Sequence, residues 1–186
     1  MARSCSTCVL IVDDDEHLRE LLARHFARAG FEALHAEDGL EGLAVLRDIL
    51  PKVIISDLQM PRMSGVEFIG VLRQRFPAIP VILLSGLSPR ELPEDVKPDR
   101  WIQKDRAMLR DVVRAVDELA RRAPDYIDAR QVVSVPIRAR PGFADHVVLT
   151  CTDCLRTFRW EVAPAEVEGT AACSHCGARV PFRIES

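Results

Sequence analysis

The fold of this chain is decided by a short apolar stretch that ends in acidic residues, Val9-Leu10-Ile11-Val12-Asp13-Asp14. Unbroken apolar and β-branched runs of this length are typical of strands buried on both faces of a sheet. Two further runs of the same kind occupy residues 53–56 and 81–84. Such strands belong to parallel sheets, because helices cover both sides. The stretch therefore predicts a central strand of a parallel α/β sheet.

Segments in which apolar residues recur at helical spacing separate these runs. The periodicity predicts helices over residues 18–29, 40–46, 66–76 and 107–122, and shorter strands over 31–36 and 101–103. Alternating strands and helices form right-handed βαβ units, so we expect one sheet with helices on both sides. Between Ser85 and Lys104 lie Pro89, Pro93 and Pro98, and we expect no full helix there, because each proline removes a helical donor.

Reactive side chains stand where these strands end. They are Asp13 and Asp14 after the first strand, Asp57 after the third, Ser85 after the fourth and Lys104 after the fifth. The carboxyl ends of parallel strands share one edge of the sheet, where α/β proteins bind ligands. Three carboxylates brought together raise one another's pKa unless a cation is present, and hard oxygen ligands suit Mg²⁺. The pattern predicts a magnesium site at which Asp57 attacks a phosphoryl group, with Lys104 and Ser85 stabilising the developing charge.

The same residues carry a family resemblance. The chain resembles the receivers of two-component response regulators in the stretch quoted above, in Ile55-Ser56-Asp57-Leu58-Gln59-Met60-Pro61, in Leu84-Ser85-Gly86, and in Trp101 three positions before Lys104. The resemblance spans residues 8–122. It implies a flavodoxin-like, doubly wound, five-stranded parallel sheet similar to that of the chemotaxis regulators.

The resemblance also implies how a metal would be held. Asp57 would be the phosphoacceptor. Asp14, Asp57 and the backbone carbonyl of Gln59 would bind Mg²⁺ directly, and Asp13 would act on the metal through water. By this likeness the protein catalyses only its own phosphorylation and dephosphorylation, and is not an enzyme that turns over other substrates.

Three further residues take switching roles by the same likeness. Ser85 would hydrogen-bond the aspartyl phosphate, Lys104 would pair with it, and Trp101 would change rotamer when Ser85 is drawn inward. The family usually follows its lysine with a proline in a cis peptide, whereas this chain has Asp105 at that position.

The six cysteines form three pairs, each with the spacing C-x-x-C. The last two pairs are Cys151, Cys154, Cys173 and Cys176. Their C-x₂-C-x₁₈-C-x₂-C spacing is that of a tetrahedral Zn²⁺ site made from two knuckles, and residues 146–186 resemble a small β zinc ribbon. Four thiolates leave no open position on the metal, so we expect a structural zinc that replaces a larger core. His175, inside the second knuckle, is an alternative ligand.

The first pair, Cys5 and Cys8, allows three readings. Cys8 begins the first strand and can pack as a small apolar residue. The pair can also be a second metal site or a redox pair. Both cysteines lie at the amino end of the strand, opposite the acidic edge, which excludes them from phosphotransfer.

Charge and composition bear on partners. The net charge is −3, and from residue 123 onward there are seven Arg, no Lys and eight Asp or Glu, so a nucleic-acid partner is possible but not favoured. The longest apolar runs are too short to span a bilayer, and we expect no membrane partner. The first eight residues do not resemble a signal peptide, so a cytoplasmic location is expected.

These features predict four segments: an N-terminal extension (1–7), a receiver (8–122), a linker with a strand (123–145) and a zinc ribbon (146–186). The leading hypothesis is a response regulator of a phosphorelay. A sensor histidine kinase or phosphotransfer protein would phosphorylate it, and the ribbon would be the output or docking module for a downstream protein target. One alternative is a transcription regulator that binds DNA through the ribbon. The other is a phosphohydrolase with Asp13 as nucleophile and Asp15 two residues on.

Overall fold

The structure is a computed structural model that describes residues 2–86, 97–105, 108–124, 137–141, 146–162 and 167–184, with only the backbone in 137–141. Two expectations fall partly outside these residues. The proline-rich segment, expected to lack a full helix, lies largely in 87–96, and most of the strand expected before residue 137 lies in 125–136.

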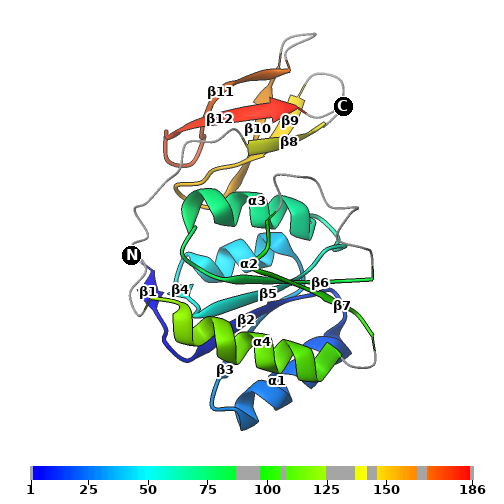
Figure 1. The fold of residues 1–186 in the computed structure, drawn as a ribbon. Coiled ribbons are helices and arrows are strands. Elements are labelled where there is room, and N and C mark those ends of the chain that lie inside the picture. The colour runs from blue at the N-terminus through cyan, green and yellow to red at the C-terminus, as the bar shows by residue number, and fades with distance from the viewer. Residues whose placement is uncertain are drawn as a thin grey trace.

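Five parallel strands form the larger sheet, in the order β3-β2-β5-β6-β7 (Figure 1). They are β2 (Cys8–Val12), β3 (Glu32–Ala36), β5 (Val53–Asp57), β6 (Val81–Ser85) and β7 (Arg100–Gln103). The chain steps outward from β2 to β3 and then returns past β2 to β5, so the strand order reverses at β2. A reversal of this kind opens a crevice at the carboxyl ends of the central strands. The predicted doubly wound parallel sheet is confirmed.

In the described part of the chain, helices cover both faces of this sheet (Figure 1). On one side lie α2 (Gly39–Leu46) and α3 (Gly65–Arg75), and on the other lie α1 (Glu16–Arg28) and α4 (Met108–Arg122). Alternate residues of β2 face opposite sides: Val9 and Ile11 pack in the core beneath α1 and α4, and Leu10 and Val12 in the core beneath α2 and α3. The side chains of β2, β5 and β6 are buried on both faces, as the unbroken apolar runs predict.

The helices begin where the sequence supplies capping side chains. The Asp15 carboxylate accepts hydrogen bonds from the first-turn amides of α1, and the Asp38 carboxylate does the same for α2. Ser64 and Glu67 form a capping box at the start of α3. These caps place the loops that leave β2, β3 and β5 at fixed angles above the carboxyl edge of the sheet.

The N-terminal residues are attached to the domain by a short strand pair that the sequence did not predict. β1 (Arg3–Ser4) runs parallel to β4 (Ile49–Leu50), and the Cys5 amide donates to the Leu50 carbonyl at 2.9 Å. The residues expected to form a separate extension therefore belong to the edge of the receiver-like unit.

A second sheet, here called the C-terminal module (residues 137–184), has the strand order β10-β9-β8-β12-β11. Its strands are β8 (Ile137–Pro141), β9 (His146–Thr150), β10 (Thr157–Glu161), β11 (Glu168–Ala172) and β12 (Arg179–Ile184). β8 pairs with both β9 and β12, although the sequence placed it in a linker. Pro141 ends this strand and pairs with Val147.

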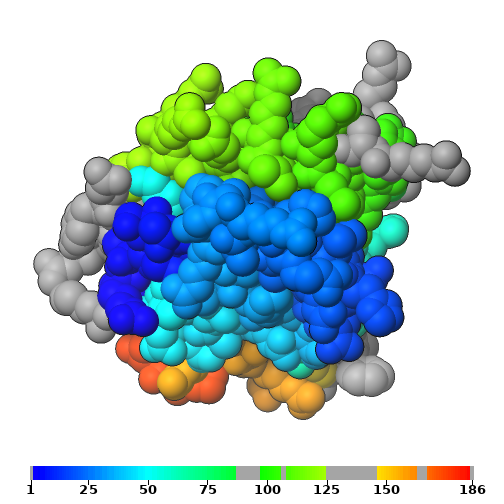
Figure 2. Space-filling view, turned by 90° about the horizontal axis from the view of Figure 1, so that it is seen from below, coloured from blue at the N-terminus to red at the C-terminus, as the bar shows by residue number. Residues whose placement is uncertain are grey.

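The C-terminal module lies over α3, on the face of the larger sheet away from α1 and α4 (Figure 1). Leu155 of the module is buried in the same cluster of side chains as the residues of α2 and α3. The opposite face shows α1 and α4 uncovered, with residues of the module visible only at the rim (Figure 2). Within the described ranges, no helix combines the length and apolar character needed to cross a bilayer.

The start of α3 gives a direct test of how closely this helix approaches β5. A Cβ atom on Gly65 would overlap the backbone oxygen of Asp57 and lie 3.0 Å from its carbon, and neither backbone atom can move freely. Gly65→Ala should therefore lower the free energy of unfolding by about 1–3 kcal/mol. Gly70→Ala is the matched control on the same helix, because a Cβ there meets nothing within 4 Å. It should raise stability by up to about 1 kcal/mol in urea titrations; equal effects of the two substitutions would contradict the packing.

Candidate functional site

The acidic residues meet a lysine at the carboxyl edge of the larger sheet. Asp13 follows β2, Asp57 ends β5, and Lys104 follows β7. The Lys104 Nζ lies 3.0 Å from an oxygen of Asp13 and 3.0 Å from an oxygen of Asp57. Both carboxylates are buried, whereas the Lys104 side chain is 27% exposed. The lysine therefore joins three strand ends and faces solvent on one side.

Burial and pairing shift the ionisation of these groups. Burial raises the pKa of the Asp13 carboxyl, and hydrogen bonds from Asp15 and Lys104 offset this rise only in part. Burial disfavours the charged form of Lys104, but hydrogen bonds and ion pairs with Asp57 and Asp13 outweigh it and raise the pKa of the ammonium. A buried carboxylate whose charge is poorly compensated is a site that gains from a cation.

The arrangement fits a divalent ion bound by oxygen. Asp13, Asp14 and Asp57 each offer a carboxylate oxygen, and these oxygens lie within 4.8 Å of one another. Ligands at about 2.1 Å from Mg²⁺ span about 4.2 Å across an octahedron, so the cluster matches this ion after small movements. Asp14 is exposed, which leaves room for water and an incoming anion. Gln59 is exposed in the loop after β5, and its role as a carbonyl ligand stays a prediction.

The remaining two predicted residues flank the lysine. Ser85 is buried at the end of β6, and the backbone amide of Lys104 donates to its carbonyl at 2.9 Å. Trp101 is partly buried on β7 and packs against the core beneath α2 and α3. Its indole Nε1 is buried, and no hydrogen-bond partner for it is found in the described part of the chain.

A protein-family model supports what this geometry suggests: the model of the response regulator receiver domain matches residues 9–97. This chain contains a response regulator receiver domain. The match includes the strand ends that carry the carboxylates and Ser85, and the structure adds Lys104 just beyond it.

Curated relatives share this domain over part of their length. The DNA-binding transcriptional regulator NtrC of Salmonella typhimurium is 40% identical over 80 residues, which are 43% of this chain and 17% of that protein. Response regulator MprA of Mycobacterium avium is 31% identical over 127 residues, which are 67% of this chain and 55% of that protein. The chain thus spans 17–55% of the length of these relatives.

Solved receiver structures superpose on the same part of the chain. Response regulator TrrA from Thermotoga maritima, in complex with Mg(2+)-BeF, has a TM-score of 0.56 at 29% identity and covers 61% of this chain and 98% of its own. Chemotaxis response regulator CheY4 of Vibrio cholerae has a TM-score of 0.54 at 31% identity and covers 59% of this chain and 98% of its own. Both matches leave about two fifths of this chain uncovered.

The receiver geometry bears on two features noted in the sequence. With Asp105 in place of the family's proline, Lys104 still pairs with Asp13 and Asp57. Asp15, the second carboxylate of the phosphohydrolase alternative, caps α1 by accepting hydrogen bonds from the His17 and Leu18 amides. A carboxylate held in this way is poorly placed as a general acid, so the structure does not favour the alternative.

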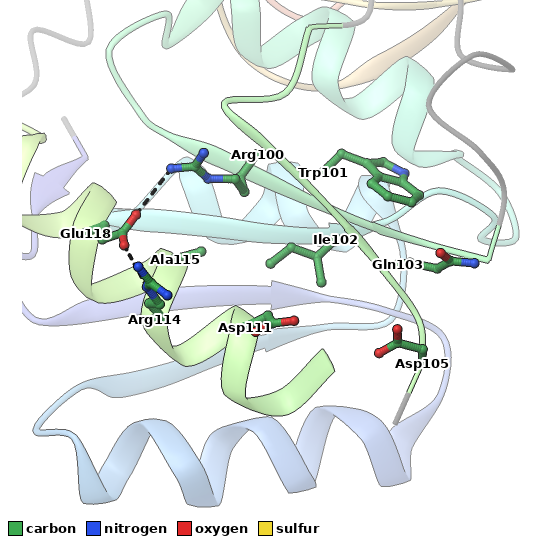
Figure 3. A pocket seen from close by; sticks show the side chains of 9 residues that line it. All are labelled: Arg100, Trp101, Ile102, Gln103, Asp105, Asp111, Arg114, Ala115 and Glu118. Carbon is green, nitrogen blue, oxygen red and sulfur yellow. Dashed lines mark hydrogen bonds and ion pairs between the residues drawn. The ribbon is translucent and has the colours of Figure 1, made fainter. Parts of the chain in front are cut away.

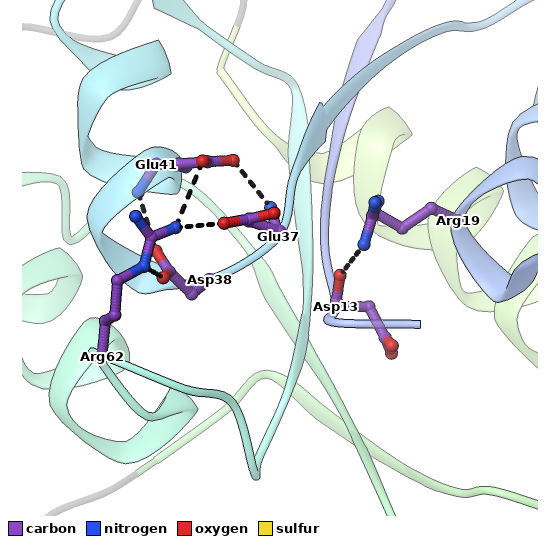
Figure 4. A network of polar contacts seen from close by, with 6 residues as sticks. All are labelled: Asp13, Arg19, Glu37, Asp38, Glu41 and Arg62. Carbon is purple, nitrogen blue, oxygen red and sulfur yellow. Dashed lines mark hydrogen bonds and ion pairs between the residues drawn. The ribbon is translucent and has the colours of Figure 1, made fainter. Parts of the chain in front are cut away.

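An arginine in the loop after β5 was not identified from the sequence. Arg62 forms ion pairs with Asp38, Glu37 and Glu41 at the start of α2 (Figure 4). Its backbone has φ 56°, in the left-handed region that most residues avoid. The Asp38 side chain is fully buried, so the guanidinium compensates a charge that water cannot reach. Arg62 thus ties the loop that follows Asp57 to α2.

An arginine also supports the loop after β2. The Arg19 guanidinium, from α1, donates a hydrogen bond to the backbone carbonyl of Asp13 (Figure 4). Leu58 donates its backbone amide to the Asp57 carboxylate at 2.7 Å. Both acidic residues are therefore oriented by backbone or side-chain donors in addition to Lys104.

A hollow of about 470 Å³ lies along the edge strand β7 and α4, outside the acidic pocket (Figure 3). Arg100 and Arg114 both pair with Glu118 at one end of it. Asp105 and Asp111 are also among its lining residues. Of the predicted phosphoryl-site residues, only Trp101 contributes to its lining.

The four late cysteines converge in the C-terminal module. The Sγ atoms of Cys151 and Cys176 are 3.6 Å apart, and those of Cys154 and Cys173 are 3.7 Å apart. Zinc–sulfur bonds of about 2.3 Å in a tetrahedron place sulfur atoms about 3.8 Å from one another, so the cluster could hold Zn²⁺. His175 points elsewhere: its Nε2 lies 3.0 Å from the Thr157 carbonyl oxygen.

The thiols of this cluster differ in acidity. Burial raises the pKa of the Cys151 and Cys154 thiols. Burial acts in the same sense on Cys173, but the backbone amides of His175 and Cys176 and the neighbouring thiols outweigh it and lower its pKa to about 7. Amides that point at a sulfur favour the thiolate, which is the form that binds metal.

The first cysteine pair forms a disulfide between Cys5 and Cys8. Cys8 is buried at the start of β2, as expected for a small apolar residue. Of the readings left open by the sequence, the disulfide fits a redox pair and does not fit a metal site, since bonded sulfurs offer no thiolate ligand. The bond adds a covalent link between the N-terminal residues and the central strand.

Without Mg²⁺, Asp13→Asn should raise the free energy of unfolding at neutral pH. Burial raises the pKa of Asp13, so the folded state binds this proton more tightly than the unfolded chain does. The stability contributed by this group is therefore largest in acid and is lost as the pH rises through the raised pKa. Urea titrations between about pH 4 and about pH 8 should show a gain for the variant that grows with pH.

Asp14→Asn is the control for this substitution, because the Asp14 side chain is exposed. Asp14→Asn removes the same charge from the same cluster without removing a buried group. We therefore expect it to raise the free energy of unfolding by less than Asp13→Asn does. A loss of stability in Asp13→Asn at neutral pH would contradict the electrostatic account of the pocket.

Proposed function

We propose that this protein is a response regulator in which Asp57 accepts a phosphoryl group from a histidine kinase or a phosphotransfer protein. The observation that carries the proposal is the pairing of Lys104 with Asp13 and Asp57, 3.0 Å from each, beside an exposed third carboxylate. That set combines a nucleophile, a fixed cation and a metal-binding cluster in one solvent-facing pocket.

Each residue has a defined task in this chemistry. An Asp57 oxygen forms a bond to phosphorus while the bond from phosphorus to the donor breaks, and the leaving group takes the electron pair. Lys104 neutralises charge on the transferred oxygens, and the Ser85 hydroxyl donates a hydrogen bond to them. Asp13, Asp14, Asp57 and the Gln59 carbonyl would hold Mg²⁺, which when bound screens the carboxylates from the incoming anion.

The position of Trp101 is suited to change when Asp57 is phosphorylated. Its buried indole N–H lacks a partner in the described part of the chain, and an unsatisfied buried donor costs about 1–3 kcal/mol. A second position in which the N–H is solvated or bonded is therefore close in free energy. When Ser85 moves toward the phosphoryl group, Trp101 can take that position, and the surface around β7 changes with it.

The C-terminal module is proposed to be a structural zinc site that serves as the output or docking module for a protein target. The convergence of four thiols at tetrahedral spacing supports the metal. NtrC is named as DNA-binding, but this chain matches 17% of it, and the acidic balance from residue 123 onward does not favour DNA.

Asp57 should be labelled by acetyl phosphate only when Mg²⁺ is present, because unscreened carboxylates repel the donor. Asp57→Asn should reduce labelling to background, measured by intact-mass spectrometry. Asp48→Asn, which removes an exposed carboxylate from the same domain, should be labelled like the wild type. Labelling of Asp57→Asn at another residue would refute the assignment.

The purified protein should contain one zinc ion per chain, and Cys173→Ser should lose it. Cys5→Ser removes a cysteine without touching the tetrahedral cluster, so its zinc content should stay at the wild-type value. Elemental analysis of the three proteins measures this. Equal zinc loss in both variants would show that the metal is not confined to the C-terminal cluster.

A further inference from the structure

The two cysteine knuckles share one backbone design. Cys151 and Cys173 each donate an amide to a carbonyl five residues on, and the residue after each second cysteine donates back to the first. That residue adopts the left-handed conformation in both knuckles: Leu155 has φ 55° and Gly177 has φ 76°. Glycine is the residue that this conformation favours, so Leu155 carries a backbone cost that Gly177 avoids.

Burial separates the two knuckles. Gly177 and the rest of the second knuckle are exposed except for Cys173. In the first knuckle, Cys151, Thr152 and Leu155 are all buried, and Leu155 is only 6% exposed. Its side chain lies in the cluster formed by the residues of α2 and α3, not in the core of the C-terminal module. The first knuckle thus faces the receiver domain, and the second faces solvent.

The receiver side of this contact is equally asymmetric. From Gly65 to Phe76, no residue of α3 or its cap is exposed, whereas α1 and α4 both carry exposed residues on their outer faces. Ile69 and Gln74 are buried in α3, and the C-terminal module lies over this helix (Figure 1). The residues of α3 that are not buried are only partly exposed, as are those of α2, so the helices on this side of the sheet are largely covered, whereas α1 and α4 are not.

We propose that the first knuckle is a metal-dependent docking element that holds the C-terminal module over α3 through Leu155. The inference rests on the proposed zinc site. Metal binding closes the knuckle and fixes Leu155 in its left-handed conformation, and burial against the receiver offsets the backbone cost. Loss of the metal releases the knuckle, so the module leaves and the face of α3 that it covers becomes exposed. Zinc occupancy and the covering of α3 are therefore linked.

Leu155→Gly separates docking from metal binding. Glycine suits the backbone of this position, so the variant should keep one zinc ion per chain while losing the side chain that docks. Hydrogen exchange of the full-length protein, read by mass spectrometry, should then be roughly tenfold faster in α3 and unchanged in α1, which the module does not cover. Leu155→Asn is the second variant, since asparagine also tolerates this conformation.

Val148→Ala is the matched control, because Val148 lies on the module's exposed surface and its truncation should leave α3 exchange at the wild-type rate. Chelation of zinc from the wild type should speed α3 exchange as Leu155→Gly does. Unchanged α3 exchange in both Leu155 variants would overturn the docking role. Unchanged α3 exchange after zinc has been removed would overturn the metal dependence. If the wild type contains no zinc and the Leu155 variants still show faster α3 exchange, the zinc site is refuted. The docking contact between Leu155 and the receiver is then still supported.

Discussion

The ammonium group of Lys104, 3.0 Å from Asp13 and from Asp57, is the interaction on which the organisation of the receiver depends. Two carboxylates are buried at the ends of neighbouring strands, and their charges would repel each other without a cation between them. The lysine can reach both only because β7 runs parallel to β2 and β5 in one sheet. The phosphoryl site is therefore a consequence of strand order as much as of residue type.

The loops around this ion pair are fixed by contacts that serve more than one element. Asp38 caps α2 with one oxygen and pairs with Arg62 through the other. Gly65 lets α3 begin directly against the backbone of Asp57. The loop that carries Gln59 is consequently held at both ends, which limits the movements available to a ligand in it. Pre-organisation of this kind suits a site whose chemistry relies on positioning and charge.

The C-terminal module is joined to the receiver by packing as well as by the chain. The sequence placed the receiver and the ribbon in separate segments, but Leu155 of the module is buried with the side chains of α2 and α3. Because α3 borders Asp57 on one side and the module on the other, a single helix contacts both the phosphoryl site and the cysteine knuckle. On the opposite face, the described residues of the module do not cover α1 and α4 (Figure 2).

Local patterns in the sequence determined the strands, the helices, the acidic pocket and the cysteine cluster, because each depends on residue spacing. Apolar runs and helical periodicity place β2, β5 and β6 and the four helices to within a few residues. Only the tertiary structure decided four further features. They are the contacts of Arg62, the burial of Leu155, the pairing of β1 with β4, and the position of β8 in the second sheet. Each of these depends on a partner that is distant in the chain: Asp38 for Arg62, the core beneath α3 for Leu155, and β12 for β8. Spacing along the chain carries no information on such partners, because the strand order and the docking of one sheet on the other bring them together.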